Sequence, residues 1–312
     1  MSDYNFSIEA KNLNKTYNKK RGADIKALIN FNINIPKGSI YGLLGPNGAG
    51  KSTFINILGS LVIKDSGKVK ICGIDIDEDA KESRKKIGIV PQELNIDPFF
   101  TPIELLELQA GLYGVRKKDR KSEEILSHLG LLEQKNAYAR TLSGGMRRRL
   151  LVAKALVHNP EIIILDEPTA GVDVELRKNL WNYIKDLNNK GTTICLTTHY
   201  LEEAENLCDH ITIINKGKIL KSDTKENILN LIGKKTVSFA LDEKIQIPYD
   251  LNRYNPVINN NKLLVNYDKN ITQLKEIIEI LNKNNISFYE INTYESDLED
   301  VFINLITGLY LF

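Results

Sequence analysis

One segment constrains this chain more than any other. Gly45-Pro-Asn-Gly-Ala-Gly-Lys-Ser52 fits the pattern G-x-x-x-x-G-K-[ST]. It stands directly after the short apolar segment Ser39–Leu44 and directly before a helical pattern over Lys51–Leu58. In this context glycines let consecutive backbone N–H groups turn toward one anion, and the N-terminus of the helix adds partial positive charge. The segment therefore predicts a phosphate-binding loop between a strand and a helix.

The chemistry of such a loop assigns roles to its residues. We expect Lys51 to reach the β- and γ-phosphates of a nucleoside triphosphate and to act in catalysis, and the Ser52 hydroxyl to bind Mg²⁺. A glycine-rich turn with a coincidental lysine is the alternative, and the strand and helix on either side make it the weaker one. The residues predicted to bind the nucleotide here are Gly45, Pro46, Asn47, Gly48, Ala49, Gly50, Lys51, Ser52 and Thr53.

A second pattern is an apolar run that ends in two carboxylates, Ile162-Ile-Ile-Leu-Asp166-Glu167. Four consecutive apolar residues favour a strand buried on both faces of a parallel sheet, and ligands bind beyond the C-terminal ends of such strands. We expect Asp166 to hold hydrated Mg²⁺ and Glu167 to polarise the attacking water. An ordinary solvated loop is the alternative interpretation, and the phosphate-binding loop weakens it.

Strand-like and helix-like segments alternate up to about Leu231, which predicts an α/β domain with a largely parallel sheet. Strands are predicted at Ile29–Ile35, Ser39–Leu44, Val69–Cys72, Ile87–Val90, Ile162–Leu165, Thr193–Leu196 and Ile211–Ile214. Helices are predicted at Lys51–Leu58, Pro102–Tyr113, Asp119–Leu129, Ser143–His158, Val174–Asn188 and Leu201–Leu207.

The composition changes after Gly233, and we predict a domain over residues 1–232 and a small α+β module over residues 233–312. The loop-rich segment Asn252–Lys262 lies inside that module. The module is predicted to contain strands at Val237–Leu241, Leu263–Tyr267 and Ile286–Ile291, a helix over Thr272–Asn282 and a final helix.

The N-terminus of the final helix is predicted at Ser296, because Ser296 and Glu299 fit an S-x-x-E capping box. Its apolar residues fall on one face at helical spacing. We interpret this face as packing on the module's own sheet, and a dimer contact is the alternative. The residues of the face are Leu298, Val301, Phe302, Leu305 and Ile306.

Composition excludes several classes of protein. The 42 basic and 40 acidic residues give a formal net charge of +2, so a dedicated nucleic-acid binder is not expected. The cysteines Cys72, Cys195 and Cys208 are scattered without a C-x-x-C pair, which predicts reduced, buried thiols rather than a disulfide framework or zinc site. The start of the chain lacks the pattern of a signal peptide.

No segment approaches the roughly 20 apolar residues that span a bilayer. The nearest candidate, Val301–Phe312, is too short. We therefore expect a soluble protein whose membrane role, if any, comes through a partner.

Two basic runs are predicted to be solvated faces or charges at helix starts. They are Arg116-Lys117-Lys118 and Arg147-Arg148-Arg149. Contact with loops of a partner or with lipid headgroups is the alternative.

A third motif narrows the field. Leu142-Ser143-Gly144-Gly145-Met146 resembles the signature of the ABC family, with Met146 where that family usually has glutamine. A serine hydroxyl and glycine N–H groups at a helix start form a second site for an anion. The resemblance implies that Ser143, Gly144 and Gly145 of one subunit close over ATP held by the phosphate-binding loop of another.

Further residues match elements of the same family in order along the chain. The resemblance implies that Tyr17 stacks on adenine, that Gln92 meets Mg²⁺ beside the membrane partner, and that Asp173 links the two sites of a dimer. It also implies that His199 contacts the γ-phosphate and holds Glu167 and water in place, whereas an isolated histidine would more often be structural.

Longer stretches are similar to the ABC-2 or drug-resistance exporter ATPases, and within them to the YadG-like group. These stretches are Leu142–Arg149, Glu167–Asp173 and Thr197–Ala204, together with the helix start Leu298-Glu299-Asp300-Val301-Phe302. The implied fold is a P-loop NTPase of the ABC type, with a helical subdomain and the C-terminal α+β module.

The resemblance implies an ATPase that uses ATP and Mg²⁺ and works as a homodimer or as a heterodimer with a like ATPase. It would power transport through a separate integral membrane permease, at the cytoplasmic face, and would touch the membrane only through that permease. A soluble ABC ATPase acting on ribosomes or DNA is the alternative, disfavoured by a single set of motifs and no heptad run. An importer ATPase is a third possibility, and nothing in the chain encodes the cargo.

Overall fold

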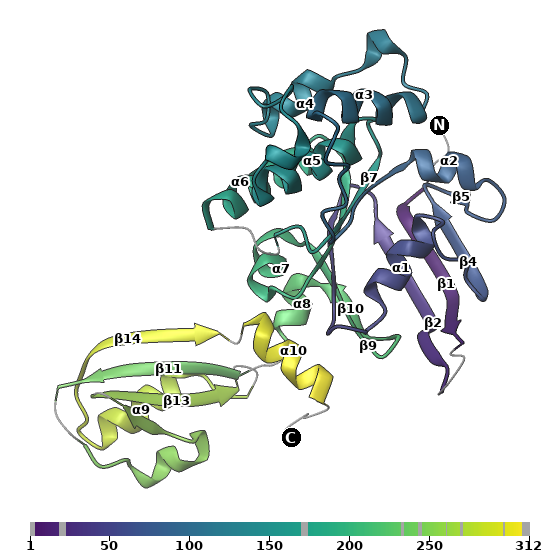
Figure 1. The fold of residues 1–312 in the computed structure, drawn as a ribbon. Coiled ribbons are helices and arrows are strands. Elements are labelled where there is room, and N and C mark those ends of the chain that lie inside the picture. The colour runs from purple at the N-terminus through teal and green to yellow at the C-terminus, as the bar shows by residue number, and fades with distance from the viewer. Residues whose placement is uncertain are drawn as a thin grey trace. The chain divides into compact units, whose positions relative to one another are not determined.

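The computed structural model describes residues 4–18, 23–169, 174–231, 234–242, 245–259, 261–268, 271–295 and 297–307. Contacts between residues divide the chain into two units, Met1–Lys225 and Glu226–Phe312, which are described separately (Figure 1). The domain boundary predicted between residues 232 and 233 falls on residues outside the described ranges and stays a prediction.

A six-stranded sheet organises the first unit, in the order β10-β9-β3-β8-β7-β6. The strands run parallel except for β10, which pairs antiparallel with β9 at one edge. The prediction of an α/β fold with a largely parallel sheet is confirmed. The strands are β3 (Ile40–Leu44), β6 (Ile87–Val90), β7 (Ile162–Asp166), β8 (Thr193–Thr198), β9 (His210–Asn215) and β10 (Lys218–Thr224).

A second, antiparallel sheet in the order β2-β1-β4-β5 was not predicted as a sheet, although the strands predicted at Ile29–Ile35 and Val69–Cys72 overlap its strands β2 and β4. Its first strand gave no signal in the sequence, because irregularities in its register with β2 interrupt the period of two, and its only fully buried apolar residues are Ile8, Ala10 and Leu13. The strands are β1 (Phe6–Tyr17), β2 (Ile25–Pro36), β4 (Ser66–Ile71) and β5 (Ile74–Asp75).

Seven helices and the start of an eighth lie within the described part of the first unit. Among them, α3, α4 and α5 pack on one another as a helical subdomain, and α5 also contacts β6 (Figure 1). The helices are α1 (Lys51–Leu58), α2 (Ala80–Lys85), α3 (Pro102–Leu112), α4 (Ser122–His128), α5 (Gly144–Leu156), α6 (Val174–Asn189), α7 (Leu201–Leu207) and α8 (Lys225–Leu229).

The hydrophobic core of this unit forms around α1, whose apolar residues belong to one cluster with residues of both sheets. The rings of Phe31 on β2 and Phe54 on α1 lie with their centroids 5.0 Å apart. Burying a side chain of this size contributes about 1.5–3 kcal/mol. This packing holds α1 against both sheets, so that the loop between the end of β3 and the start of α1 is fixed at both ends.

The second unit is an antiparallel sheet in the order β12-β13-β11-β14, with α9 packed on one face through Ile277 and Leu281. The segment read as a loop, Asn252–Lys262, begins inside a 3₁₀ helix over Tyr249–Tyr254 and contains the short strand β12. The elements are β11 (Lys234–Leu241), β12 (Val257–Asn259), β13 (Lys262–Asp268), α9 (Leu274–Lys283), β14 (Phe288–Glu295) and α10 (Leu298–Thr307).

The capping box predicted at the start of α10 stays a prediction. Ser296 lies outside the described residues, and the side chain of Asp297 accepts a hydrogen bond from the backbone N–H of Asp300 at 2.9 Å. Leu298 and Val301 are buried, yet neither is a member of the cluster between the sheet and α9. What this face packs against therefore stays a prediction.

Two expectations drawn from composition meet their tests here. Cys72, Cys195 and Cys208 are buried free thiols, as predicted, and burial raises the pKa of Cys195 to about 12. Within the described ranges, no helix combines the length and the apolar character needed to cross a bilayer.

Candidate active site

The phosphate-binding loop requires glycine at two positions because the neighbouring backbone comes close. A Cβ on Gly45 would lie 2.4 Å from the carbonyl oxygen of Ile214 in β9. Gly50 has φ +115°, and a Cβ there would lie 2.5 Å from the carbonyl oxygen of Ala27 in β2. The loop is thus held between the two sheets, with no room for larger residues at these positions.

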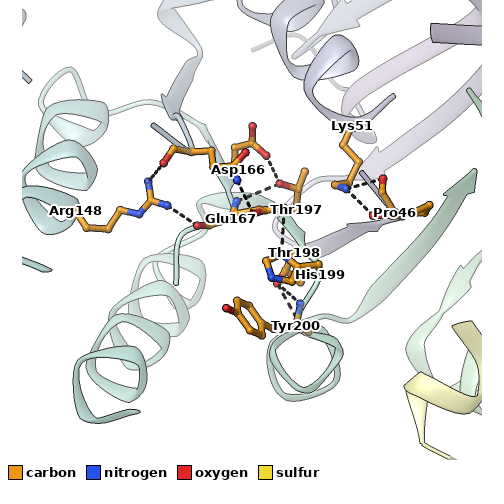
Figure 2. Close-up of polar contacts among 11 residues, drawn as sticks. Pro46, Lys51, Arg148, Asp166, Glu167, Thr197, Thr198, His199 and Tyr200 are labelled. Carbon is orange, nitrogen blue, oxygen red and sulfur yellow. Dashed lines mark hydrogen bonds and ion pairs between the residues drawn. The ribbon is translucent and has the colours of Figure 1, made fainter. Parts of the chain in front are cut away.

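Lys51 lies inside the curve of this loop (Figure 2). It is only 6% exposed, and its Nζ donates to the carbonyl oxygens of Gly45 at 2.5 Å and Pro46 at 3.3 Å. Burial lowers the pKa of Lys51, while the charges of Glu167 and Asp166 oppose that shift. The N-terminus of α1 has no side-chain cap and no acidic residue in its first turn. A partly buried cation and backbone N–H groups without side-chain partners thus meet in one loop, as an anion site requires.

Asp166 is the last residue of β7, which is separated in the sheet from β3, the strand before the phosphate-binding loop, by β8 alone. The register pairs it with Thr197 on β8, and β8 in turn pairs with β3. Asp166 is 8% exposed and accepts a hydrogen bond from Thr197 Oγ1 at 2.5 Å. Burial raises the pKa of Asp166. A bound cation would offset the cost of keeping this carboxylate ionised.

Glu167 follows with φ +49°, so the chain turns sharply where the strand ends. Its side chain is fixed on both oxygens: Oε2 accepts from Gln92 Nε2 at 2.8 Å, and Oε1 lies 3.2 Å from His199 Nδ1. Glu167 is 6% exposed, whereas the His199 side chain is 49% exposed. The structure brings His199 and Glu167 together, as expected, with the histidine at the solvent side, and it adds a contact from Gln92 to Glu167 that was not predicted. Their catalytic roles stay predictions.

The three residues predicted to hold the metal, Asp166, Ser52 and Gln92, fit Mg²⁺ by the chemistry of their donors. A carboxylate, the exposed hydroxyl of Ser52 and the side-chain amide of Gln92 offer hard oxygen atoms, which Mg²⁺ prefers. In the described part of the chain no three His, Cys, Asp or Glu side chains gather to hold a metal alone. This suits Mg²⁺ that arrives with phosphates and keeps several waters.

The segment Leu142–Met146, here called the signature loop, is more exposed than the phosphate-binding loop. Ser143 caps α5, and its Oγ accepts from the backbone N–H of Met146 at 3.2 Å. Ser143 and Gly144 are exposed, and a Cβ on Gly144 would meet no heavy atom within 4 Å. The residues of the predicted second anion site thus form an open helix start, and their binding of an anion stays a prediction.

Two further predicted residues are less defined. Tyr17 ends β1 with 38% of its surface exposed, and the Lys15 ammonium lies 5.5 Å from its ring centroid. Stacking on adenine stays a prediction. Asp173 lies outside the described residues.

One reading of the sequence is wrong. Arg148, taken as part of a solvated basic run, is only 4% exposed. Its side chain donates to the backbone carbonyl of Gln92 and to that of Glu167 (Figure 2). The signal was present: Arg148 is followed at i+3, i+4 and i+7 by Leu151, Val152 and Ala155, which are all buried on α5.

Thr197 was also missed. Its hydroxyl donates a hydrogen bond to Asp166, and its backbone carbonyl accepts one from the N–H of Glu167 at 3.0 Å. A threonine at the end of an apolar strand carries little signal, because this residue type is common in strands.

Comparison with known proteins shows which family has this sequence. Residues 28–170 match the family model described as "ABC transporter". The linearmycin resistance ATP-binding protein LnrL of Bacillus subtilis is 40% identical over 232 residues, which cover 74% of this chain and 73% of that protein. The daunorubicin resistance ATP-binding protein DrrA2 of Streptomyces coeruleorubidus is 31% identical over 310 residues, covering 96% and 95%.

A solved structure agrees with these relatives. A dimeric ATP-binding cassette in a post-hydrolysis state, bound to ADP and phosphate, matches with a TM-score of 0.62 and 32% identity. The match covers 70% of this chain and 98% of that one. The chain belongs to the ABC transporter family, as one of its ATP-binding, ATP-hydrolysing cassettes.

Proposed function

We propose that the protein is the ATPase subunit of an exporter, powering transport through a separate membrane permease of the ABC-2 type. The observation that carries this proposal is the Glu167 carboxylate held between Gln92 and His199, close to the buried Lys51. Relatives named for linearmycin resistance, daunorubicin resistance and Nod factor export support the assignment to export.

The substrate is ATP with its Mg²⁺. The backbone N–H groups of Gly45–Ser52 bind the phosphates, Lys51 offsets their charge, and Tyr17 stacks on the adenine. Asp166, Ser52 and Gln92 would hold the Mg²⁺, which adds positive charge at the phosphate oxygens.

Hydrolysis follows from the position of Glu167. Its carboxylate accepts a proton from water as the water oxygen bonds to the γ-phosphorus, and the bond to the bridging oxygen breaks to release ADP. His199 and Gln92 restrict the carboxylate to this orientation through the contacts at 3.2 and 2.8 Å. A positioned base of this kind contributes about 10²–10⁴-fold to rate.

The open signature loop supports a dimer, either of two copies or with a like ATPase. Ser143, Gly144 and Gly145 of one subunit close over ATP held by Gly45–Ser52 of the other, and Asp173 links the two sites. When the γ-phosphate is cleaved, the signature side loses its ligand and the dimer opens.

A surface beside Gln92 fits the permease. A cavity of about 410 Å³ lies next to Pro91, lined by the end of α1, β6, α3 and α5. Leu61, which lines it, is 77% exposed, and Leu112 on α3 is 74% exposed. An apolar permease segment seated here would be moved by Gln92 and the helical subdomain, and it would hold the protein at the cytoplasmic face of the membrane.

The test uses tagged Glu167→Gln protein, purified with ATP from detergent-solubilised host membranes, with co-purifying chains identified by mass spectrometry. We expect a stoichiometric polytopic membrane protein. The double variant Glu167→Gln/Lys51→Ala, which should not bind ATP, is the control. Recovery of ribosomal or DNA-bound partners instead would favour the soluble alternative.

The dimer has its own measurement. Glu167→Gln should bind ATP and remain dimeric by light scattering, because the γ-phosphate bridge is not cleaved. A monomer at saturating ATP would contradict the dimer.

A further inference from the structure

Arg148 extends from α5 toward the backbone of Glu167 (Figure 2), and it also donates to the backbone carbonyl of Gln92. We propose that Arg148 is a positioning residue for ATP hydrolysis, which holds the backbone at Gln92 and Glu167 in one fixed arrangement. It acts through these two residues and touches no reacting atom.

The geometry is a clamp of four hydrogen bonds to four backbone carbonyls. On one side, Nη1 donates to the carbonyl oxygens of Pro91 and Gln92, both at 2.8 Å. On the other side, Nη2 donates to Glu167 O at 2.6 Å and Nε to Pro168 O at 3.1 Å. A single side chain therefore spans the backbone under both ends of the Gln92–Glu167 side-chain contact.

Only arginine can make this set of bonds. A guanidinium presents five N–H donors in a rigid plane, whereas a lysine ammonium offers three donors from one point. The side chain is buried, and its charge is balanced by carbonyl dipoles and by the nearby carboxylates of Asp166, Glu167 and Glu203. Burying a charge without such compensation is costly, so the site is built for this group.

Glu167 is the residue that needs the clamp. Its backbone has a positive φ of +49°, a conformation that a residue with a side chain rarely keeps without support. Thr197 O accepts the N–H of Glu167 at 3.0 Å, and Arg148 donates to its carbonyl. The peptide groups before and after the catalytic carboxylate are thus both fixed.

The clamp also gives α5 a path to the catalytic carboxylate. Ser143 caps the helix whose second turn carries Arg148. If Ser143 closes over ATP of the partner subunit, a movement of α5 would act on Glu167 and Gln92 through Arg148. This consequence rests on the proposed function, whereas the clamp itself does not.

The first test compares Arg148→Met and Arg148→Lys with Arg149→Met in steady-state ATPase assays. Arg149, the next residue on α5, also donates to carbonyls, those of Leu129 and Gly130, away from Glu167. We expect Arg148→Met to lower kcat about 10–100-fold, as for groups that orient catalytic residues, with KM for ATP within about twofold. Arg148→Lys should recover only part of kcat, and Arg149→Met should keep kcat within about threefold. Equal losses in Arg148→Met and Arg149→Met would overturn the proposal.

The second test needs no turnover. Hydrogen exchange of the nucleotide-free protein should be faster in Arg148→Met in the segments Pro91–Glu93 and Glu167–Thr169, and unchanged in β3. Arg149→Met should leave both segments as in the wild type. Unchanged exchange in both segments would show that Arg148 does not hold them, whatever the permease result. If Arg148→Met does not fold, Arg148→Lys, which keeps the charge, serves in its place with the same expected segments.

A double-mutant cycle separates positioning from general damage. Because Arg148 acts through Glu167, adding Arg148→Met to Glu167→Gln should lower the residual rate by less than about twofold. Losses that multiply would mean that Arg148 acts independently of the carboxylate, which would contradict the proposal.

Discussion

The chain contains two loops of glycine and serine at helix starts, and they are built in opposite ways. The phosphate-binding loop Gly45–Ser52 is enclosed: Gly45 and Gly50 touch neighbouring backbone, and Lys51 is 6% exposed. The signature loop is open, with Ser143 and Gly144 exposed and empty space around Gly144.

This difference indicates that the two loops contribute different parts of a nucleotide site. The enclosed loop is complete within one chain, because the two sheets of the first unit position it and a cation lies within it. The open loop offers only a hydroxyl and N–H groups at a helix start, which fits the proposed closure of this loop over ATP held by a partner subunit. Glycine therefore serves packing in one loop and, we infer, close approach of a ligand in the other.

The largest expected effect comes from removing the positive charge of Lys51 in the enclosed loop. Lys51→Ala should lower kcat/KM for ATP by about 10³-fold, because it removes a positioned donor from the phosphates and exposes the loop carbonyls. Binding of a fluorescent ATP analogue should be lost as well. Lys118→Ala, an exposed lysine elsewhere, is the control, and retained binding in Lys51→Ala would place the phosphates elsewhere.

The next prediction contrasts the two loops by packing. Gly45→Ala should lower the free energy of unfolding by about 1–3 kcal/mol, because the new Cβ meets the backbone of Ile214 at 2.4 Å. Gly144→Ala should leave it unchanged or raise it by up to about 1 kcal/mol, since alanine favours a helix over glycine. Urea denaturation measures both, and similar losses in the two variants would remove the distinction.

A smaller effect concerns the open loop alone. Ser143→Ala should lower kcat about tenfold, a loss smaller than that of a fully enclosed donor, and leave ATP binding to the monomer within about twofold. It should also cost about 1 kcal/mol of stability through loss of the cap on Met146 N–H. Ser143→Asn restores a cap, so stability should return while kcat does not; full recovery of kcat would reduce Ser143 to a structural role.

The smallest effect is on the pH dependence of stability. Burial raises the folded-state pKa of Asp166, so the folded protein binds more protons than the unfolded one above the ordinary carboxyl value of about 3.9, and stability falls as pH rises through that interval. Asp166→Asn should remove this part of the slope and raise the melting temperature of the nucleotide-free protein at neutral pH. Calorimetry across pH measures it; an unchanged slope would mean that the carboxylate is stabilised by other groups.

Local patterns were enough to predict the parallel sheet and the loop Gly45–Ser52. The strands β6 and β7 and the helix α1 have strong local signals, because they are continuous apolar runs or directly adjoin a glycine motif. The same holds for Asp166 and Glu167, which stand at the end of β7, whereas Ser143 was predicted from the resemblance of Leu142–Met146 to the signature of the ABC family. Strand β1 was not predictable from its own residues, since its burial comes from its place between β2, the next strand along the chain, and the more distant β4.

The amino-acid sequence by itself determined the family, the loop that binds phosphate and the two carboxylates at the end of β7. Only the tertiary structure decided which polar side chains become buried. Arg148 and Lys51 are both basic residues in or beside glycine-rich helix starts, and both donate to backbone carbonyls. Arg148 joins segments from distant positions, whereas the carbonyls that Lys51 contacts belong to its own loop. The physical reason is that burial and hydrogen-bond partners depend on segments brought together from distant positions, such as Pro91 and Pro168 around Arg148.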